Sequence, residues 1–110
     1  MSRLRRLSVC NCFFLATPDL RLPSIALAYA EFVRRLRECF PGAPETTIDG
    51  VRLETPDGFL LVRESVTEPV VTMRLEGSSL EALHTLLTTC QSVLPEVSSE
   101  IARQTSSAGL

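Results

Sequence analysis

The apolar residues of this chain change their spacing twice along the sequence, and this change limits the possible folds more than any other feature. From Ser24 they fall three or four positions apart, which is the spacing of an amphipathic helix. After PGAP at 41–44 the spacing is that of strands, and from Ser78 the helical spacing returns. The residues of the first helical stripe are Ile25, Tyr29, Phe32, Val33, Leu36 and Phe40.

Turn-forming residues divide the middle of the chain into strands. A short strand is predicted within PDLRLPS at 18–24, where two prolines confine it to an edge of the sheet. The other expected elements are strands over 46–54, 59–63 and 70–75, a hairpin turn in TPDG at 55–58, and a loop over 64–69.

The second helix is expected to begin at Ser78, because Glu81 three residues later completes a capping box. Small and polar residues then predict a flexible tail over 96–110. The predicted class is α+β: a four-stranded, mainly antiparallel sheet with two helices on one face, in the order strand-helix-strand-strand-strand-helix. The inner face of the second helix would carry Leu80, Leu83, Leu86 or Leu87, Cys90 and Val93.

The composition fits one small globular domain. Of 110 residues 45% are hydrophobic, and a net charge of -2 gives no reason to expect nucleic acid as a partner. The run MSRLRRLSVCNCFFLA resembles a weak signal peptide, but Asn11 interrupts it and it is too short to span a membrane. We therefore expect a cytoplasmic protein. Residues 1–16 are interpreted as a segment outside the predicted domain. Either the start codon lies inside a longer reading frame, or the segment is a remaining piece of a neighbouring domain.

The sequence predicts no metal site. The four cysteines lack the paired spacing of a zinc site and are interpreted as reduced thiols. His84 has no serine or cysteine partner in the sequence and is interpreted as an ordinary helix residue. The cysteines are Cys10, Cys12, Cys39 and Cys90.

The stretch LVRESVTEPVVTMRLEG at 61–77 concentrates groups that can hold an anion. A phosphate monoester needs a guanidinium fork, hydroxyl donors and free backbone N–H groups around one concavity. Arg63, Ser65 and Thr67 supply these types just before a Glu-Pro turn, and Arg74 on the next strand is the candidate second fork. On residue types alone, a structural turn with exposed polar side chains is the alternative.

The longer string TIDGVRLETPDGFLLVRESVTEPVVTMRLEG resembles the C-terminal domain of the phosphomannomutase/phosphoglucomutase branch of the α-D-phosphohexomutases. The resemblance rests on separated motifs in the same order and covers residues 17–95. The motifs are Asp-Gly-Val-Arg at 49–52, Gly-Phe at 58–59, Leu-Val-Arg at 61–63, R-x-S-x-T-x-P at 63–69 and Arg-Leu-Glu at 74–76.

The resemblance implies a role in an isomerase that acts as an intramolecular phosphotransferase. Members of the family have four domains, and a phosphoserine on the first, assisted by Mg²⁺, exchanges its phosphoryl group with a hexose phosphate. The C-terminal domain holds the phosphate that is not transferred. Carried over by motif, Arg63, Ser65 and Thr67 would contact phosphate, Val66 would lend a backbone amide, and Arg74 would be a second fork.

Two departures from the family pattern qualify this expectation. The family usually has Gly or Asn where this chain has Val66, and a β-branched residue raises the cost of a positive φ, so the loop is expected to be distorted or weaker. The chain also has no serine-nucleophile loop and no Asp-x-Asp-x-Asp metal loop. We therefore expect a fragment that binds mannose or glucose 1- or 6-phosphate and is inactive alone, with Mg²⁺ and the remaining mutase domains supplied elsewhere. The alternative is a stand-alone, non-catalytic sugar-phosphate-binding or protein-interaction module.

Overall fold

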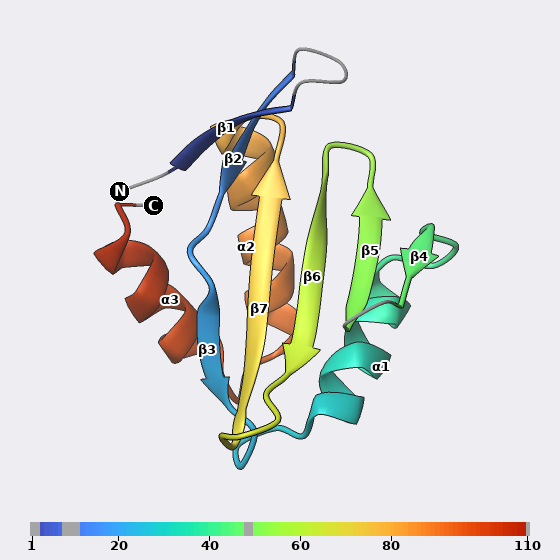
Figure 1. The fold of residues 1–110 in the computed structure, drawn as a ribbon, viewed down its shortest axis with the longest axis vertical. Helices are drawn as coiled ribbons and strands as arrows, with labels where there is room; N and C mark the ends of the chain where they lie inside the picture. The colour runs from blue at the N-terminus through green and yellow to red at the C-terminus, as the bar shows by residue number, and fades with distance from the viewer. Residues whose placement is uncertain (1–2, 8–11, 48–49, 110) are drawn as a thin grey trace.

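The structure is a computed structural model that describes residues 3–7, 12–47 and 50–109, with side chains described from Leu15 onward. Strands dominate its first three quarters and helices its end (Figure 1). In chain order the elements are β1 (Arg3–Leu7), β2 (Cys12–Ala16), β3 (Leu20–Pro23), α1 (Tyr29–Cys39), β4 (Glu45–Thr46), β5 (Val51–Thr55), β6 (Gly58–Glu64), β7 (Val70–Gly77), α2 (Leu80–Val93) and α3 (Ser98–Ser107).

The strands form one antiparallel sheet with β7 at its centre. The order is β1-β2-β7-β6-β5-β4, and β3 also pairs with β7. β6 occupies one side of β7, while β2 and β3 share the other side, β2 at Glu76 and Gly77 and β3 from Val70 to Met73. β3 is thus a short strand beside the central one, with its outer edge facing α3 rather than another strand.

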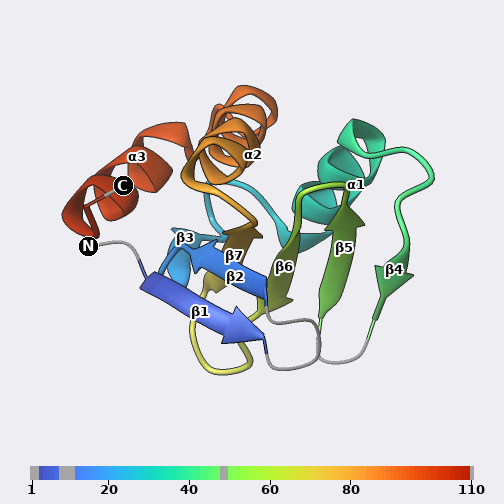
Figure 2. The same cartoon turned by 90° about the horizontal axis from the view of Figure 1, so that it is seen from above.

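The three helices α1, α2 and α3 lie on one face of the sheet (Figure 2), and the other face, here called the open face, carries none of them. Alternation along the strands separates the two faces. On β3, β6 and β7, Leu22, Val62 and Val71 point into the core at 0 to 1% exposure, whereas Arg21, Arg63 and Thr72 belong to the open face. From the helices the core receives Phe32, Val33, Leu36, Leu83, Leu87, Cys90 and Ile101.

The predicted α+β class, the antiparallel pairing and the placement of the helices on one face are confirmed. The expected count of four strands is wrong, because the described residues form a seven-stranded sheet. Two additional strands come from the N-terminal segment, where β1 pairs with β2, and a third is the two-residue β4. Cys10 and the motif residue Asp49 lie outside the described residues.

The first helix begins at Tyr29 and not near Ser24, as the spacing predicted. Two backbone hydrogen bonds explain the delay. The Ser24 N–H donates to the Pro69 carbonyl at 2.9 Å, which extends the β3–β7 pairing, and the Ala26 N–H donates to the Pro23 carbonyl at 3.2 Å, which makes a turn. Ile25 is consequently 93% exposed instead of lying in the core.

The second helix begins one residue later than predicted, because Ser79 and not Ser78 is its N-cap. The Ser79 hydroxyl accepts a hydrogen bond from the Ala82 N–H at 3.1 Å, as N-cap side chains do. Ser78 is occupied by the hairpin turn, since its N–H donates to the Asp57 carbonyl at 2.8 Å. The capping box expected from Ser78 and Glu81 is therefore wrong by one position.

The prediction of a flexible tail over 96–110 is wrong for residues 98–107, which form α3. Its sequence is polar, but Ile101 is fully buried and anchors it to the core. Gln104 then closes the open edge of β3, because its side chain accepts from the Arg21 N–H at 2.9 Å and donates to the Arg21 carbonyl at 2.8 Å. Tertiary contacts, which propensity does not register, account for this helix.

The remaining predictions concern thiols and membranes. Cys39 and Cys90 are free, and Cys90 is buried where α2 meets the sheet, as its place in the helical stripe predicted. Burial raises the pKa of the Cys90 thiol to about 12. Within the described residues no helix has the length and apolar character needed to cross a membrane.

Candidate anion-binding site

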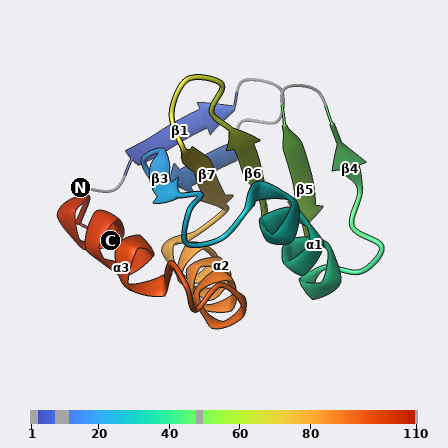
Figure 3. The same ribbon diagram turned by 90° about the horizontal axis from the view of Figure 1, so that it is seen from below.

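The loop between β6 and β7 is closed by its own backbone. The Ser65 N–H donates to the Val70 carbonyl at 3.1 Å, and the Ser65 hydroxyl accepts from the Glu68 N–H at 3.2 Å. The Val70 N–H also donates to the Glu68 carbonyl at 2.8 Å. These bonds curl residues 65–70 into a compact turn that bends towards the open face of the sheet (Figure 3).

A cavity of about 470 Å³ lies beside this loop, at the end of the sheet. Arg63, Ser65 and Val66, which the sequence placed in the site, all line it. Thr67 does not, and the side chain of Val66 is 99% exposed. The cavity also has lining residues that sequence reasoning missed: Arg21, Tyr29, Gly50, Glu64 and Thr72.

Strand register explains how distant residues reach the cavity. Thr72 pairs with Arg21 of β3 on one side and with Arg63 of β6 on the other, so the three side chains form a row across the open face. Within β3, Arg21 lies between the buried residues Leu20 and Leu22. That alternation was visible in the sequence, but only the pairing register brings Arg21 next to the loop.

Arg63 differs from the other arginines whose side chains are described, because it has no carboxylate partner among the described residues. Among the arginine side chains described from residue 15 onward, it is the only one without an ion pair. Its side chain is exposed and borders both the loop cavity and a smaller neighbouring one. An exposed guanidinium with five N–H donors and no acceptor is the group that an incoming phosphate would use.

Gly50 permits the backbone to pass close to Arg63. Its φ is +121°, and a Cβ at this position would lie 2.5 Å from the Val62 carbonyl oxygen and 2.9 Å from Arg63 Cγ. Only glycine fits such an approach without a shift. The chain before β5 therefore packs directly on the stem of Arg63 and restricts where its guanidinium can go.

Arg74, the candidate second fork, lies away from the loop. It pairs with Leu61 in the sheet and lines a separate cavity of about 150 Å³ together with Asp19, Arg63 and Thr72. It also makes an ion pair with Glu76 at 3.1 Å. Arg74 Nε is buried without a hydrogen-bond partner. The structure thus places Arg74 two residue pairs along the sheet from the Arg63–Thr72 pair, at a hollow that Arg63 also borders but outside the loop cavity.

The charges around the loop cavity are balanced among the described residues. Arg63 and Arg21 contribute positive charge, while Glu64 lines the cavity and Glu68 makes an ion pair with Arg21. Burial raises the pKa of the Tyr29 hydroxyl, and the Glu64 carboxylate raises it further. Tyr29 is therefore neutral and able to donate a hydrogen bond at the cavity wall.

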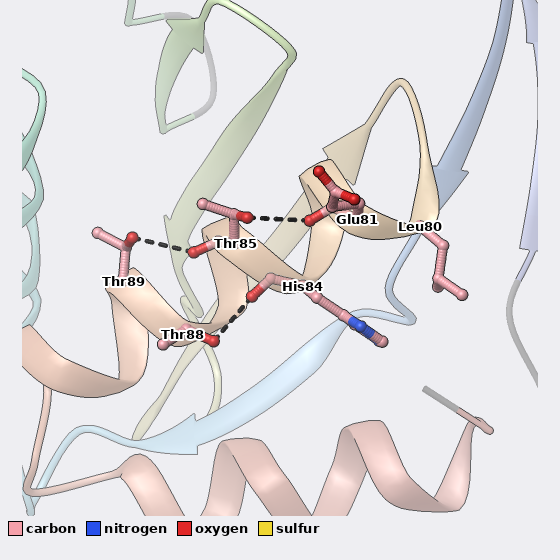
Figure 4. A pocket seen from close by; sticks show the side chains of 6 residues that line it. All are labelled: Leu80, Glu81, His84, Thr85, Thr88 and Thr89. Carbon is pink, nitrogen blue, oxygen red and sulfur yellow. Dashed lines mark hydrogen bonds between the residues drawn. The ribbon is translucent and has the colours of Figure 1, made fainter.

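A broader hollow on the outer side of α2 is less suited to an anion. It measures about 660 Å³ and is lined only by α2 residues, including His84 and Glu81 (Figure 4). Its threonines are already occupied, because the hydroxyls of Thr85, Thr88 and Thr89 donate to helix carbonyls four residues earlier at 2.9 to 3.0 Å. These three hydroxyl hydrogens are therefore not available to an anion.

The described residues do not fit a metal ion. Nowhere in residues 3–7, 12–47 and 50–109 do three His, Cys, Asp or Glu side chains come together as ligands. Mg²⁺ is usually held by carboxylate oxygens together with substrate phosphates, and of the two carboxylates near the loop Glu68 is paired with Arg21.

Comparison with known proteins identifies the family. The model for "Phosphoglucomutase/phosphomannomutase, C-terminal domain" matches residues 20–89, from β3 into α2. The chain belongs to this family. The match includes Arg21, Arg63 and the β6–β7 loop and ends before α3, which confirms the resemblance seen in the sequence.

Individual relatives agree with this assignment. The chain is 51% identical over 45 residues to a phosphoglucomutase of Neisseria meningitidis serogroup B, covering 40% of this chain and 10% of the relative. It is 41% identical over 56 residues to a phosphomannomutase/phosphoglucomutase of Pseudomonas aeruginosa, covering 51% and 12%. The crystal structure of a phosphoglucomutase/phosphomannomutase family protein from Burkholderia thailandensis superposes with a TM-score of 0.54 at 39% identity, over 72% of this chain and 17% of that one. The chain thus corresponds to a small part of each of these proteins.

Proposed function

We propose that this domain binds the phosphate group of a hexose phosphate, such as glucose or mannose 1- or 6-phosphate, in the cavity beside the β6–β7 loop. The observation that carries the proposal is the unpaired, exposed guanidinium of Arg63 at that cavity. Ser65 and the loop amides, including that of Val66, provide further donors. The family membership and the names of the relatives support a sugar-phosphate ligand.

In this proposal the domain positions substrate in an isomerase that transfers a phosphoryl group within a hexose phosphate. Binding and orientation are the contribution that we assign to this domain, because the cavity brings together an arginine, a hydroxyl and loop amides, the groups that hold a phosphate in place. The nucleophilic serine and Mg²⁺ would come from other mutase domains, in the cytoplasm. A stand-alone binding or interaction module is the second candidate, and a docking surface on α1 would favour it.

The arginines of α1 are poor competitors for an anion. Arg34 bonds Glu31 and Glu38, and Arg35 bonds Glu31 and Glu96. Each guanidinium would have to leave a carboxylate before it could bind phosphate, whereas Arg63 would not.

The test is an NMR titration of the ¹⁵N-labelled chain with glucose 1-phosphate and mannose 1-phosphate. We expect amide shifts to concentrate at residues 63–70. Arg63→Ala should weaken binding about ten- to a hundredfold, since a charge-assisted hydrogen bond contributes roughly 1.5 to 3 kcal/mol. Arg74→Ala should weaken it less, because Arg74 lies at the other cavity and is paired with Glu76.

Arg52→Ala is the matched control. It removes one positive charge from the same face of the sheet, but Arg52 is engaged by Glu54 and lies over the Phe59 ring, outside both cavities. Thermal unfolding should show that all variants remain folded. If Arg63→Ala binds as the parent does, or the shifts map to α1, the assignment of the phosphate site is wrong and the interaction module becomes the better explanation.

A further inference from the structure

Arg21 is placed to reach the same anion as Arg63, although it lies 42 positions earlier in the chain and outside the loop motif. Both line the loop cavity, and Thr72 lies between them as the register partner of each. The backbone of Arg21 is fixed by two hydrogen bonds to Gln104 of α3. Its guanidinium is therefore presented from a held strand edge and not from a loop.

The guanidinium of Arg21 is occupied in this structure by the loop itself. One of its terminal nitrogens bonds a carboxylate oxygen of Glu68, the residue that precedes Pro69 in the β6–β7 loop. The contact involves a single guanidinium nitrogen, unlike the two-nitrogen contact of Arg35 with Glu96. Both side chains are about half exposed, at 53% and 55%.

We propose that Arg21 is a second anion-binding arginine of this site and that Glu68 is an internal competitor for it. An incoming phosphate would replace the Glu68 carboxylate on Arg21 and bridge Arg21 to Arg63. This inference rests on the proposed function, since it assumes that an anion binds in the loop cavity.

The physical basis is the difference between the Arg21–Glu68 ion pair and the contact that a phosphate would make with Arg21 and Arg63. An exposed, single-nitrogen ion pair contributes little to stability, so it is displaced at small cost. A phosphate carries up to two negative charges and can accept from both arginines at once, so it can make more charge-assisted hydrogen bonds than the single contact that the Glu68 carboxylate makes with Arg21. Glu68 therefore lowers the affinity without abolishing binding, and only its side-chain contact with Arg21 is lost when the anion arrives, since the Ser24 N–H still holds the Pro69 carbonyl.

The experiment is a double-mutant cycle on the full chain, read by NMR titration with glucose 1-phosphate and with inorganic phosphate. Glu68→Gln should tighten binding about three- to fivefold, the range expected when a weak exposed ion pair no longer competes. In the Arg21→Gln background, Glu68→Gln should change the phosphate affinity no more than the control substitution Glu64→Gln does. Arg21→Gln alone should weaken binding about tenfold.

Glu64→Gln is the matched control, because Glu64 also lines the cavity and contributes one negative charge but makes no ion pair among the described residues. Equal effects of the two glutamate changes in both backgrounds would show that Glu68 acts only as a nearby charge, and would overturn the proposal. The proposal would also be overturned if Arg21→Gln left the phosphate affinity unchanged while Arg63→Ala lowered it. That result would leave the proposed phosphate site itself intact. Loss of any effect of Arg63→Ala would instead refute the proposed function.

Discussion

At the scale of single residues, the position of Arg63 depends on the glycine that lies against its side chain, Gly50. Gly50 approaches the Arg63 side chain so closely that a Cβ would overlap both the Val62 carbonyl and Arg63 Cγ. It belongs to the Asp-Gly-Val-Arg motif on which the family resemblance partly rests. The glycine of this motif is thus explained by its close approach to Arg63 and to the Val62 backbone.

Gly50→Ala tests this explanation. We expect a loss of stability of about 1 to 3 kcal/mol from the strained backbone, and weaker phosphate binding because Arg63 must move. Gly42→Ala is the control: φ at Gly42 is also positive, at +76°, but a Cβ there would meet nothing within 4 Å. Chemical denaturation measures the first effect and the NMR titration the second. Equal phosphate affinity in both folded variants would contradict the link between Gly50 and Arg63.

The sequence predicted the cavity-lining residues that are neighbours in the chain. It missed the residues that reach the cavity only through the register of the strands. Arg63, Ser65 and Val66 are close in sequence and line one cavity. Arg74 is only eleven positions from Arg63, but its pair with Leu61 lies two residue pairs from the Arg63–Thr72 pair, and it lines the smaller cavity and not the loop cavity. Arg21 joins the site through the β3–β7 pairing. A sequence pattern that predicts the strands without their register cannot show that Arg21 lines the loop cavity and that Arg74 does not.

At the scale of elements, one arginine ties α1 to the end of α2. Arg35 donates to Glu31 on its own helix at 3.1 Å, to the Val93 carbonyl at 3.1 Å, and to both oxygens of Glu96 at 2.7 and 2.8 Å. Arg34 and then Arg35 lower the pKa of Glu31 to about 2, and Arg35 lowers the pKa of Glu96. The helix layer is therefore held partly by carboxylates that must stay ionised.

This network predicts how stability depends on pH. A carboxyl group whose pKa is lower in the folded state stabilises the fold fully above its unfolded pKa of about 4.5, and the contribution disappears as pH falls towards 2. The free energy of unfolding should decline over that window, and Arg35→Gln should make the decline shallower. Arg63→Gln, which removes an arginine without an ion pair among the described residues, should leave the slope as it is. Urea unfolding at pH 2.5 to 6 measures both; identical slopes for the two variants would show that Arg35 does not control this titration.

Element boundaries were predictable where turn chemistry acts alone and failed where tertiary hydrogen bonds intervene. The hairpin of β5 and β6 lies where TPDG placed it. The start of α1 was misplaced because Ser24 continues the sheet by bonding Pro69. α3 was missed because its helix depends on Ile101 reaching the core and on Gln104 closing β3, neither of which appears as a strong helical period.

At the scale of the whole molecule, the site lies where three distant parts of the chain meet at one end of the sheet. β3 brings Arg21, the segment before β5 brings Gly50, and β6 with its loop brings Arg63. The helices cover the opposite face, and among the described residues Tyr29 at the start of α1 is the one helix residue that lines the cavity. Such a site is open to solvent, and in the proposed function it would hold one group of a substrate. It does not enclose one.

This openness leads to the expectation that the isolated chain binds hexose phosphates without converting them. Positioning by Arg63 and Arg21 can orient a phosphate, but phosphoryl transfer also needs an acceptor nucleophile and charge stabilisation at the transferred group, commonly from Mg²⁺. Within the described residues no carboxylate cluster suits that ion. Glucose 1-phosphate incubated with the purified chain, Mg²⁺ and glucose 1,6-bisphosphate should yield glucose 6-phosphate no faster than a protein-free blank, even at concentrations where NMR shows binding. The Arg63→Ala variant serves as the matched sample: turnover that survives repurification in the parent and falls with Arg63→Ala would show that this domain carries transfer chemistry of its own.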